Sequence, residues 1–313
     1  MLQTTSKSIL KPIVSVLMPA YNVEKYIAIA IESILNQSFT NFEFIILDDG
    51  SSDSTARIID SYADRRIRKV FLPQNIGLVN ARNTLVTMAE GRFIAFLDAD
   101  DIAMTDRLET QVQVLEADLA DICGASYFSL YEEMGKKKSS RQRYSDSDIR
   151  ALMVITSPLC NPTVMVKAEI LKKYPYQIGK NYAEDYSLWV KLALEGYRFL
   201  NLRQKLIIYR IYAAQTSQVQ QNGINSVFSQ SRKEYIDSLG IPLSMIPGPI
   251  SIKHRITLAI PFMVILNKRI EGISVAANSE IYSRYQFRSN GMLTPFTRME
   301  RWLIAIFVSL IRF

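Results

Sequence analysis

Short apolar runs alternate along the first 131 residues with segments whose apolar residues recur at helical spacing. Uninterrupted apolar runs are typical of strands buried on both faces of a sheet, and spacings of three and four residues are typical of helices with one buried face. The pattern predicts strands at Ile13–Ala20, Phe42–Leu47, Ile67–Leu72, Phe93–Leu97 and Asp121–Tyr131. It predicts helices at Val23–Gln37, Ser54–Ala63, Leu78–Glu90 and Thr105–Asp118.

This alternation of strands and helices indicates consecutive βαβ units. It predicts an α/β fold in which a mostly parallel, Rossmann-like sheet is flanked by helices. Because crossovers between parallel strands are right-handed, the carboxyl ends of the strands are expected at one edge of the sheet. Ligands of open α/β sheets bind at that edge.

Beyond residue 131 the pattern is less regular. The polar and basic segment Glu132–Arg143 predicts an exposed loop, and a solvated turn is favoured there over a binding site. Pro158–Leu171 and Glu184–Leu194 together predict a short strand and two helices.

Three carboxylates follow the predicted strand at Phe93–Leu97, in the sequence FIAFLDADD. Alternate residues of a strand point to the same face, so Asp98 and Asp100 are expected to face one spot. Asp101 is expected to cap the next segment or to support its neighbours. Like charges this close destabilise each other unless a cation joins them. The cluster therefore predicts a site for a divalent cation and a phosphate.

A second acidic segment follows the predicted strand at Phe42–Leu47. Asp48 and Asp49 lead into Gly50, which supplies a turn. Asp53 is expected to cap the helix that follows. Paired aspartates at the ends of two strands in one sheet are hard to explain by structure alone, so a shared ligand site is expected.

Five segments carry a resemblance to a known family. VSVLMPAYN from residue 14, IILDDGSSDST from 45, NIGLVNARN from 75, GRFIAFLDADD from 91 and AEDYSLWVKLALEG from 183 occur in the order found in family-2 glycosyltransferases. The chain resembles these inverting enzymes over about residues 13–215. The resemblance implies the A-type nucleotide-sugar-binding fold, a sugar–nucleotide donor, Mn²⁺ or Mg²⁺ as cofactor, and transfer with inversion at the anomeric carbon.

The resemblance also implies roles for individual residues. It implies that Asp49 binds the nucleobase, that Asp98 lies near the donor ribose or sugar, and that Asp100 holds the metal. It implies that Asp185 is the general base, with Glu184 as the alternative. It implies that the segment containing Pro19, Tyr21 and Asn22, where the first strand ends, lines the nucleotide pocket. It also implies that Arg82 is a basic residue beside the nucleotide.

Elementary chemistry agrees with these roles. A nucleoside diphosphate leaves as an anion, and a divalent ion that bridges the diphosphate neutralises it as a Lewis acid. Mg²⁺ often takes only one or two protein carboxylates, with phosphate and water completing its shell. A base that removes the acceptor's proton accelerates transfer roughly 10²- to 10⁴-fold. Taken alone, Asp185 fits a first-turn acid favoured by the helix dipole, but the other motifs favour the base.

One position departs from the family pattern. Family members often carry a histidine shortly after a Tyr-Arg pair near the end of the domain. Here Tyr212 follows Tyr209 and Arg210 at the expected position. Tyr212 is expected to offer a hydrogen bond to a phosphate. The only histidine, His254, lies outside the matched segments and is interpreted as part of a basic surface.

Composition sets the broad class. The 313 residues are 48% hydrophobic and 21% charged, which is an ordinary globular balance. Cys123 and Cys160 are the only cysteines, too few for a disulfide framework or a zinc site. No signal peptide is recognised at the start, so a cytoplasmic location is expected.

The net charge of +7 is concentrated near the C-terminus, where residues 251–313 hold nine Lys or Arg and three Asp or Glu. Thr297–Phe313 predicts a basic amphipathic helix whose longest uncharged run, ten residues, is too short to span a bilayer. A helix lying on anionic lipid is favoured over one docked on the protein core. Ile241–Ile250 holds three prolines and a glycine, which is typical of a linker. A catalytic domain over residues 1–240, and a linker with a basic amphipathic, membrane-docking helical extension over 241–313, are therefore expected.

The sequence thus predicts a metal-dependent, inverting glycosyltransferase that adds one sugar, with a UDP-sugar as the favoured donor. By analogy with the family, the acceptor is expected to be a glycan or lipid-linked intermediate of bacterial surface polysaccharide synthesis, at the inner face of the cell membrane. The alternatives are a sugar nucleotidyltransferase and a catalytically degenerate nucleotide-sugar-binding protein. No G-x-G-x-x-G opens the first helix, and no nucleic-acid-binding module is recognised.

Overall fold

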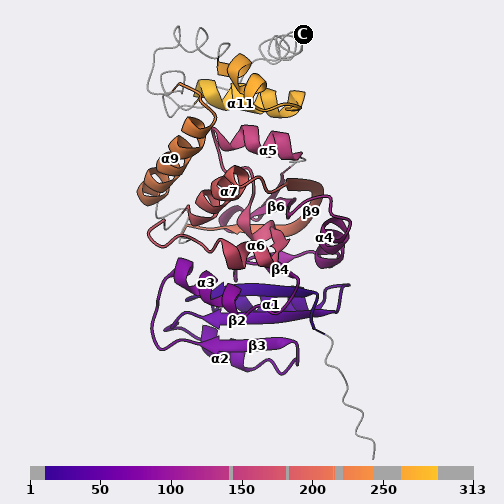
Figure 1. Cartoon of the computed structure of the whole chain (residues 1–313). Helices are drawn as coiled ribbons and strands as arrows, with labels where there is room; N and C mark the ends of the chain where they lie inside the picture. Colours follow the sequence, from indigo (N-terminus) through magenta and orange to yellow (C-terminus); the bar gives the residue numbers. More distant parts are fainter. Residues whose placement is uncertain are drawn as a thin grey trace, which may run out of the picture.

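A computed structural model describes residues 11–140, 144–180, 183–213, 215, 221–242 and 262–287. Within them the chain forms a nine-stranded sheet with helices packed against it. Figure 1 shows the first parallel strands at one end of the molecule. The helices α5 (Asp146–Met153), α9 (Gln221–Ser238) and α11 (Val275–Phe287) lie toward the other end.

The first half of the sheet is parallel. β1 (Val14–Ala20) lies between β2 (Phe42–Asp48) and β4 (Phe93–Phe96), and β3 (Ile67–Phe71) pairs with β2. The helices that connect these strands are α1 (Ile27–Leu35), α2 (Thr55–Asp60) and α3 (Leu78–Met88). This arrangement confirms the predicted α/β fold and its βαβ units.

The second half of the sheet is mixed. β6 (Ile122–Tyr131) pairs in parallel with β9 (Phe199–Ile211), and β8 (Met165–Lys167) joins β6 to β4 by antiparallel pairing. β5 (Ile102–Ala103) and β7 (Lys136–Ser139) are short antiparallel additions to β9 and β6. The remaining α-helices of this half are α4 (Arg107–Glu116), α6 (Ala168–Lys173) and α7 (Glu184–Leu194). β8 therefore makes both halves one continuous sheet.

The central strands are buried on both faces, because their side chains alternate between two hydrophobic clusters. In β1, Leu17 belongs to one cluster, while Val16 and Met18 belong to the other. In β2, Ile45 and Ile46 divide in the same way. The first cluster includes residues of α3, α5 and α7, and the second includes residues of α1 and α4. This two-sided burial explains why the strands appear in the sequence as uninterrupted apolar runs.

The predicted loop at Glu132–Arg143 is partly wrong. Residues Glu132–Met134 form a 3₁₀ turn, and β7 pairs back along the end of β6 as a hairpin. All four residues of β7 are exposed, so the prediction of exposure is confirmed for that strand. Its three lysines gave no strand pattern in the sequence, and lysines are common on sheet edges because they discourage further pairing.

The described part of the C-terminal region packs against the rest of the molecule. Phe262, Leu266 and Ile281 are fully buried in the same hydrophobic cluster as residues of α5 and α7. The backbone N–H of Ser274 donates to Asp148 Oδ1 of α5 at 2.6 Å. Residues 262–281 are therefore part of the main core.

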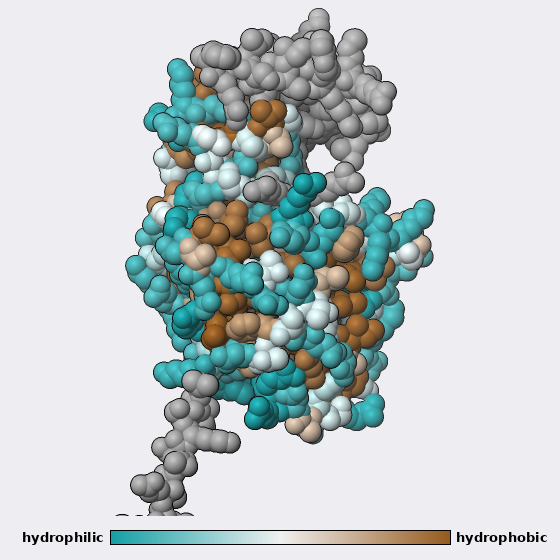
Figure 2. Space-filling model, turned by 90° about the vertical axis from the view of Figure 1, so that its right-hand side faces the viewer, coloured by the Kyte–Doolittle hydropathy of each residue, from teal (hydrophilic) through white to brown (hydrophobic). Residues whose placement is uncertain are grey.

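The expectations for His254 and for the helix at Thr297–Phe313 lie outside the described residues. In the part of the chain that the structure covers, we find no helix with the length and apolarity needed to cross a membrane. Figure 2 shows one face of the molecule, on which hydrophobic residues form patches among hydrophilic ones.

Candidate active site

The carboxyl ends of β1, β2 and β4 lie side by side, as parallel pairing requires. The segments that leave them are residues 21–26, 49–54 and 97–101. The backbone N–H of Asp49 donates to the carbonyl of Ala20 at 2.8 Å, which fastens the first two ends together. Because open α/β sheets bind ligands at this edge, the predicted donor-binding segments lie where a nucleotide would be expected.

The segment after β1 is tied to the segment after β2 through Asn22. Asn22 has a φ of 50°, a left-handed conformation that asparagine tolerates better than most residues. Its N–H donates to Ser51 Oγ at 2.9 Å, and its Oδ1 accepts from the N–H of Ser52 at 2.8 Å. Pro19 is half-buried within β1, and Tyr21 is 47% exposed. Tyr21 and Asn22 are thus exposed, whereas Pro19 is partly covered.

Asp49 is only 3% exposed and holds the loop that precedes α3. Its Oδ1 accepts from the N–H of Ile76 at 2.8 Å, and its Oδ2 accepts from the N–H of Gly77 at 3.1 Å. Gly50 has a φ of +70°, and a Cβ there would lie 2.6 Å from the Gln74 backbone. Only glycine therefore lets these two loops approach so closely. The contact of Asp49 with a nucleobase stays a prediction.

The acidic turn after β4 differs from its predicted geometry. β4 ends at Phe96, and the N–H of Asp101 donates to the carbonyl of Asp98 at 3.0 Å, closing a turn. The alternation of strand side chains therefore does not apply to Asp98 and Asp100. Each carboxylate has its own partner: Asp98 Oδ1 accepts from Arg82 at 3.2 Å, and Asp100 Oδ2 accepts from the Tyr212 hydroxyl at 2.9 Å.

Asp100 lies in the field of the neighbouring carboxylate of Asp98. Burial and the charge of Asp98 raise the pKa of Asp100 to about 6, although the hydrogen bond from Tyr212 acts in the opposite direction. Burial and the charge of Asp100 in turn raise the pKa of the Tyr212 phenol. Tyr212 therefore stays neutral, and its hydroxyl donates a hydrogen bond to Asp100 rather than to a phosphate.

Asp101 supports the acidic turn from the protein interior. It is fully buried, and its Oδ1 accepts from the N–H of Arg210 in β9 at 2.9 Å. Among the residues described, its Oδ2 has no hydrogen-bond partner. Burial and the charge of Asp100 raise its pKa well above the usual range. This agrees with the expectation that Asp101 supports its neighbours.

Arg82 connects three elements of the site. It projects from α3, is 4% exposed, and binds both Asp98 of the acidic turn and Glu184 at the start of α7. Its guanidinium also lies 5.6 Å from the ring centre of Tyr176. The predicted place of Arg82 beside the nucleotide is untested. Its observed contacts hold the acidic turn and α7 at a fixed separation.

Asp185 and Glu184 occupy the first turn of α7 but have different surroundings. Asp185 is half-buried, and its Oδ1 accepts from the N–H of Tyr186 at 2.7 Å. Burial and the charge of Glu184 raise the pKa of Asp185, although Arg82 lowers it. Glu184 is buried and paired with Arg82, so it is less available than Asp185 as a base. A carboxylate with a raised pKa suits proton removal near neutral pH.

Comparison with known proteins identifies the family. A family model described as Glycosyl transferase family 2 matches residues 15–174, just over half of the chain. The chain belongs to glycosyl transferase family 2. The putative teichuronic acid biosynthesis glycosyltransferase TuaG of Bacillus subtilis is 44% identical over 205 residues, which cover 64% of this chain and 80% of TuaG. This confirms the predicted family and the assignment as a glycosyltransferase, with a relative named for bacterial polysaccharide biosynthesis.

Solved glycosyltransferase structures share the fold. TarS 1-349 of S. aureus, crystallised with UDP-GlcNAc, superposes with a TM-score of 0.58 at 20% identity and covers 95% of this chain and 81% of that one. The mannosyltransferase PcManGT of Pyrobaculum calidifontis, with GDP-Man and Mn²⁺, gives a TM-score of 0.56 at 15% identity, covering 97% and 87%. These similarities confirm the predicted A-type glycosyltransferase fold.

The acidic turn of this family-2 glycosyltransferase fits a divalent cation only in part. Among the residues described, no group of three or more His, Cys, Asp or Glu side chains is arranged to hold a metal ion. The turn nevertheless carries closely spaced carboxylates, and Asp101 Oδ2 is buried without a partner. The closely spaced carboxylates suit a cation that takes its other ligands from a diphosphate and water.

Three residues near the glycosyltransferase site were not predicted from the sequence: Cys160, Asn161 and Tyr176. Burial and the charges of nearby carboxylates, Asp101 first and then Asp98, raise the pKa of the partly buried Cys160 thiol. Next to it, Asn161 Oδ1 accepts from the Tyr176 hydroxyl at 3.3 Å, and Asn161 Nδ2 is buried with no partner in the part of the chain that the structure describes. No charge pattern or spacing marks these residues, because only the tertiary fold brings them to the acidic turn.

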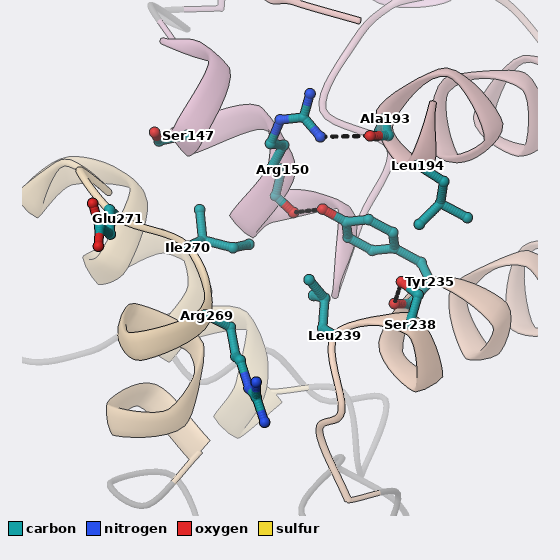
Figure 3. Close-up of a pocket in the computed structure, with 10 residues that line it drawn as sticks. All are labelled: Ser147, Arg150, Ala193, Leu194, Tyr235, Ser238, Leu239, Arg269, Ile270 and Glu271. Atoms are coloured by element: carbon teal, nitrogen blue, oxygen red, sulfur yellow. Dashed lines mark hydrogen bonds between the residues drawn. The ribbon is translucent and has the colours of Figure 1, made fainter. Parts of the chain in front are cut away.

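A cavity of about 380 Å³ lies elsewhere in the fold. Figure 3 shows its lining, which comes from α5, α7, α9 and residues 269–271. The Arg150 guanidinium lies at this cavity but is already bonded to the carbonyls of Ala193 and Tyr197. None of the predicted site residues lines the cavity. It therefore does not contribute to the candidate active site.

Proposed function

We propose that this protein transfers one sugar from a nucleotide-sugar donor, with a UDP-sugar as first choice, to an acceptor hydroxyl with inversion at the anomeric carbon. Asp185 is the general base, and Asp100 holds Mn²⁺ or Mg²⁺. The donor nucleotide contacts the loops that carry Tyr21 and Asp49. Family membership supports the transfer of a sugar, and the nucleotides named for TarS and PcManGT support this donor class.

The observation that carries the proposal is the Arg82 bridge. Arg82 binds Asp98 on one side and Glu184 on the other, so the acidic turn and the start of α7 are held close together. A donor diphosphate at the turn would then leave its anomeric carbon between the turn and Asp185. Such positioning is a large part of catalysis, because it turns an encounter of two reactants into an oriented reaction.

Asp185 acts on the acceptor. A hydroxyl is a poor nucleophile until its proton is taken, and a half-buried carboxylate can accept that proton as the oxygen attacks. The hydroxyl oxygen forms the new bond to the anomeric carbon while the bond to the diphosphate oxygen breaks on the opposite face. A divalent ion held by Asp100 supplies Lewis-acid stabilisation of the departing diphosphate.

The acceptor is proposed to be a glycan or lipid-linked intermediate of bacterial surface polysaccharide synthesis. The similarity to TuaG, named for teichuronic acid biosynthesis, supports this class. An acceptor anchored in lipid would be met by a protein on the cytoplasmic surface of the membrane, which is the proposed location.

Donor binding and transfer are tested together. The protein is incubated with a panel of UDP-sugars and with GDP-mannose, each with Mn²⁺ or Mg²⁺ and with a lipid extract as acceptor. Release of nucleoside diphosphate reports transfer, thermal shift reports donor binding, and NMR of the product reports anomeric configuration. A sound preparation that binds no sugar nucleotide with either metal contradicts the proposal.

Two variants separate the roles. Asp100→Ala is expected to abolish metal-dependent donor binding. Asp185→Asn is expected to keep donor binding and to lower transfer by roughly 10²- to 10⁴-fold. The control is Asp106→Asn, an exposed aspartate without a side-chain cap bond. Tight donor binding by the unaltered protein without transfer to any extract would instead favour the degenerate binding protein.

A further inference from the structure

Tyr212 stands where the family resemblance predicts a histidine, and its hydroxyl does not face open space. It donates to Asp100 Oδ2 at 2.9 Å, which links the residue that follows β9 to the acidic turn. An imidazole could bind a metal directly. A neutral phenol is a poor metal ligand but a good donor to a carboxylate, and bonds to ionised acceptors are the stronger ones.

Other residues pack near the ring of Tyr212 and support it. Its centre lies 5.1 Å from that of Tyr26, which is buried where the chain enters α1. The Arg210 guanidinium lies 5.0 Å from the ring centre of Tyr26, and Arg210 forms an ion pair with Glu132. Tyr212, Tyr26 and Arg210 therefore form a column, here called the Tyr212 column, that fixes the hydroxyl against Asp100.

Arg210 fastens the column to the turn a second time, because its backbone N–H donates to Asp101 Oδ1. Two neighbouring carboxylates of the turn are thus held by β9 and by the residue that follows it. Residues that orient a metal ligand without touching the metal commonly change affinity 10- to 100-fold when altered.

We propose that Tyr212 is a positioning residue for the metal ligand. Its hydroxyl fixes Asp100 Oδ2 and leaves Asp100 Oδ1 to hold a divalent ion that would stabilise the charge of the donor diphosphate. In this chain a bond to the ligand thus takes the place of the family histidine. The inference rests on the proposed function, because it requires that Asp100 hold the metal.

The test is the affinity for Mn²⁺, measured on the full chain by the EPR signal of free Mn²⁺ with saturating UDP, and in parallel with GDP. Tyr212→Phe keeps the ring and removes the hydroxyl. It is expected to weaken Mn²⁺ binding about 10- to 100-fold. Nucleotide affinity in EDTA and the thermal midpoint without ligand are expected to stay unchanged.

Tyr209→Phe is the matched control, because it removes a hydroxyl three residues away that bonds Gln215 rather than Asp100. It is expected to bind Mn²⁺ within about twofold of the unaltered protein. Tyr26→Leu keeps the Tyr212 hydroxyl but removes the supporting ring, and it is expected to give an intermediate loss. This variant keeps the test decisive if Tyr212→Phe does not fold.

The outcomes separate the inference from the function on which it rests. If Tyr212→Phe, or Tyr26→Leu in its place, binds Mn²⁺ as tightly as the unaltered protein while Asp100→Ala does not, the inference is wrong and the proposed function stands. If Asp100→Ala also binds normally, Asp100 is not the ligand and the inference is wrong. If the unaltered protein binds no nucleotide with Mn²⁺, the proposed function itself fails.

Discussion

Glu184 and Asp185 are adjacent carboxylates whose surroundings separate their chemistry. Glu184 is buried and neutralised by Arg82, whereas Asp185 is half-buried and its bonded oxygen accepts only from a backbone N–H. Burial and the Glu184 charge raise the pKa of Asp185. The carboxylate with the raised pKa is the one suited to exchange a proton during turnover.

This difference predicts the pH dependence of transfer. A base works only when unprotonated, so a raised pKa makes kcat/KM fall on acidification at a higher pH than for an ordinary aspartate. Glu184→Gln removes a negative neighbour and should move that acid limb to lower pH. A pH–rate profile of both proteins measures the shift. An acid limb that does not move would contradict the electrostatic argument.

The sequence indicated the carboxylates of the site but not their partners. Asp98, Asp100 and Asp185 follow or begin apolar elements, so their positions along the chain showed that they lie at element ends. The pairing of Arg82 with Glu184 joins residues 102 positions apart. Nothing local in the sequence encodes such a pair, because it depends on how α3 and α7 pack.

At the scale of elements, Arg82 fixes α3, the acidic turn and α7 relative to one another. Arg82→Met would leave Glu184 as a buried, unpaired carboxylate. Breaking a buried ion pair by removing one partner typically costs about 3–5 kcal/mol. We expect a loss of that size in the free energy of unfolding, measured by urea denaturation.

The control for this prediction is Arg92→Met. Arg92 pairs with Glu116 at an exposed site, where both side chains are about half accessible or more. Exposed pairs contribute roughly 0–1 kcal/mol, so this variant should be nearly neutral. If Arg82→Met lost no more free energy of unfolding than Arg92→Met, the Arg82 bridge would not hold these elements together.

Elements with regular patterns were predictable, and others were not. β1, β2 and β4 of the first half are mostly apolar, so their positions were apparent, and β3 keeps apolar residues on both sides of Arg68 and Lys69. β9 was missed because Arg203, Gln204 and Lys205 interrupt its apolar residues. α5 was missed although Ser145 and Asp148 form a capping box at its start, a signal that the sequence contains.

At the scale of the whole molecule, described residues on both sides of the predicted division near residue 240 share one hydrophobic core. The described residues after it include Leu266, which is fully buried in the same cluster as Leu152 of α5 and Trp189 of α7. One core usually unfolds as one cooperative unit. The described C-terminal helices are therefore expected to unfold together with the α/β sheet.

Leu266→Ala tests this expectation. Removing a buried leucine side chain leaves a cavity and typically costs about 2–5 kcal/mol. If the core is shared, urea denaturation followed by circular dichroism should show one transition whose midpoint falls for the whole molecule. Lys268→Ala, at an exposed position on the same helix (residues 262–269), should leave the midpoint nearly unchanged. Two transitions, of which Leu266→Ala moves only the smaller, would instead support a separate unit after residue 240, because the cavity would then weaken that unit alone.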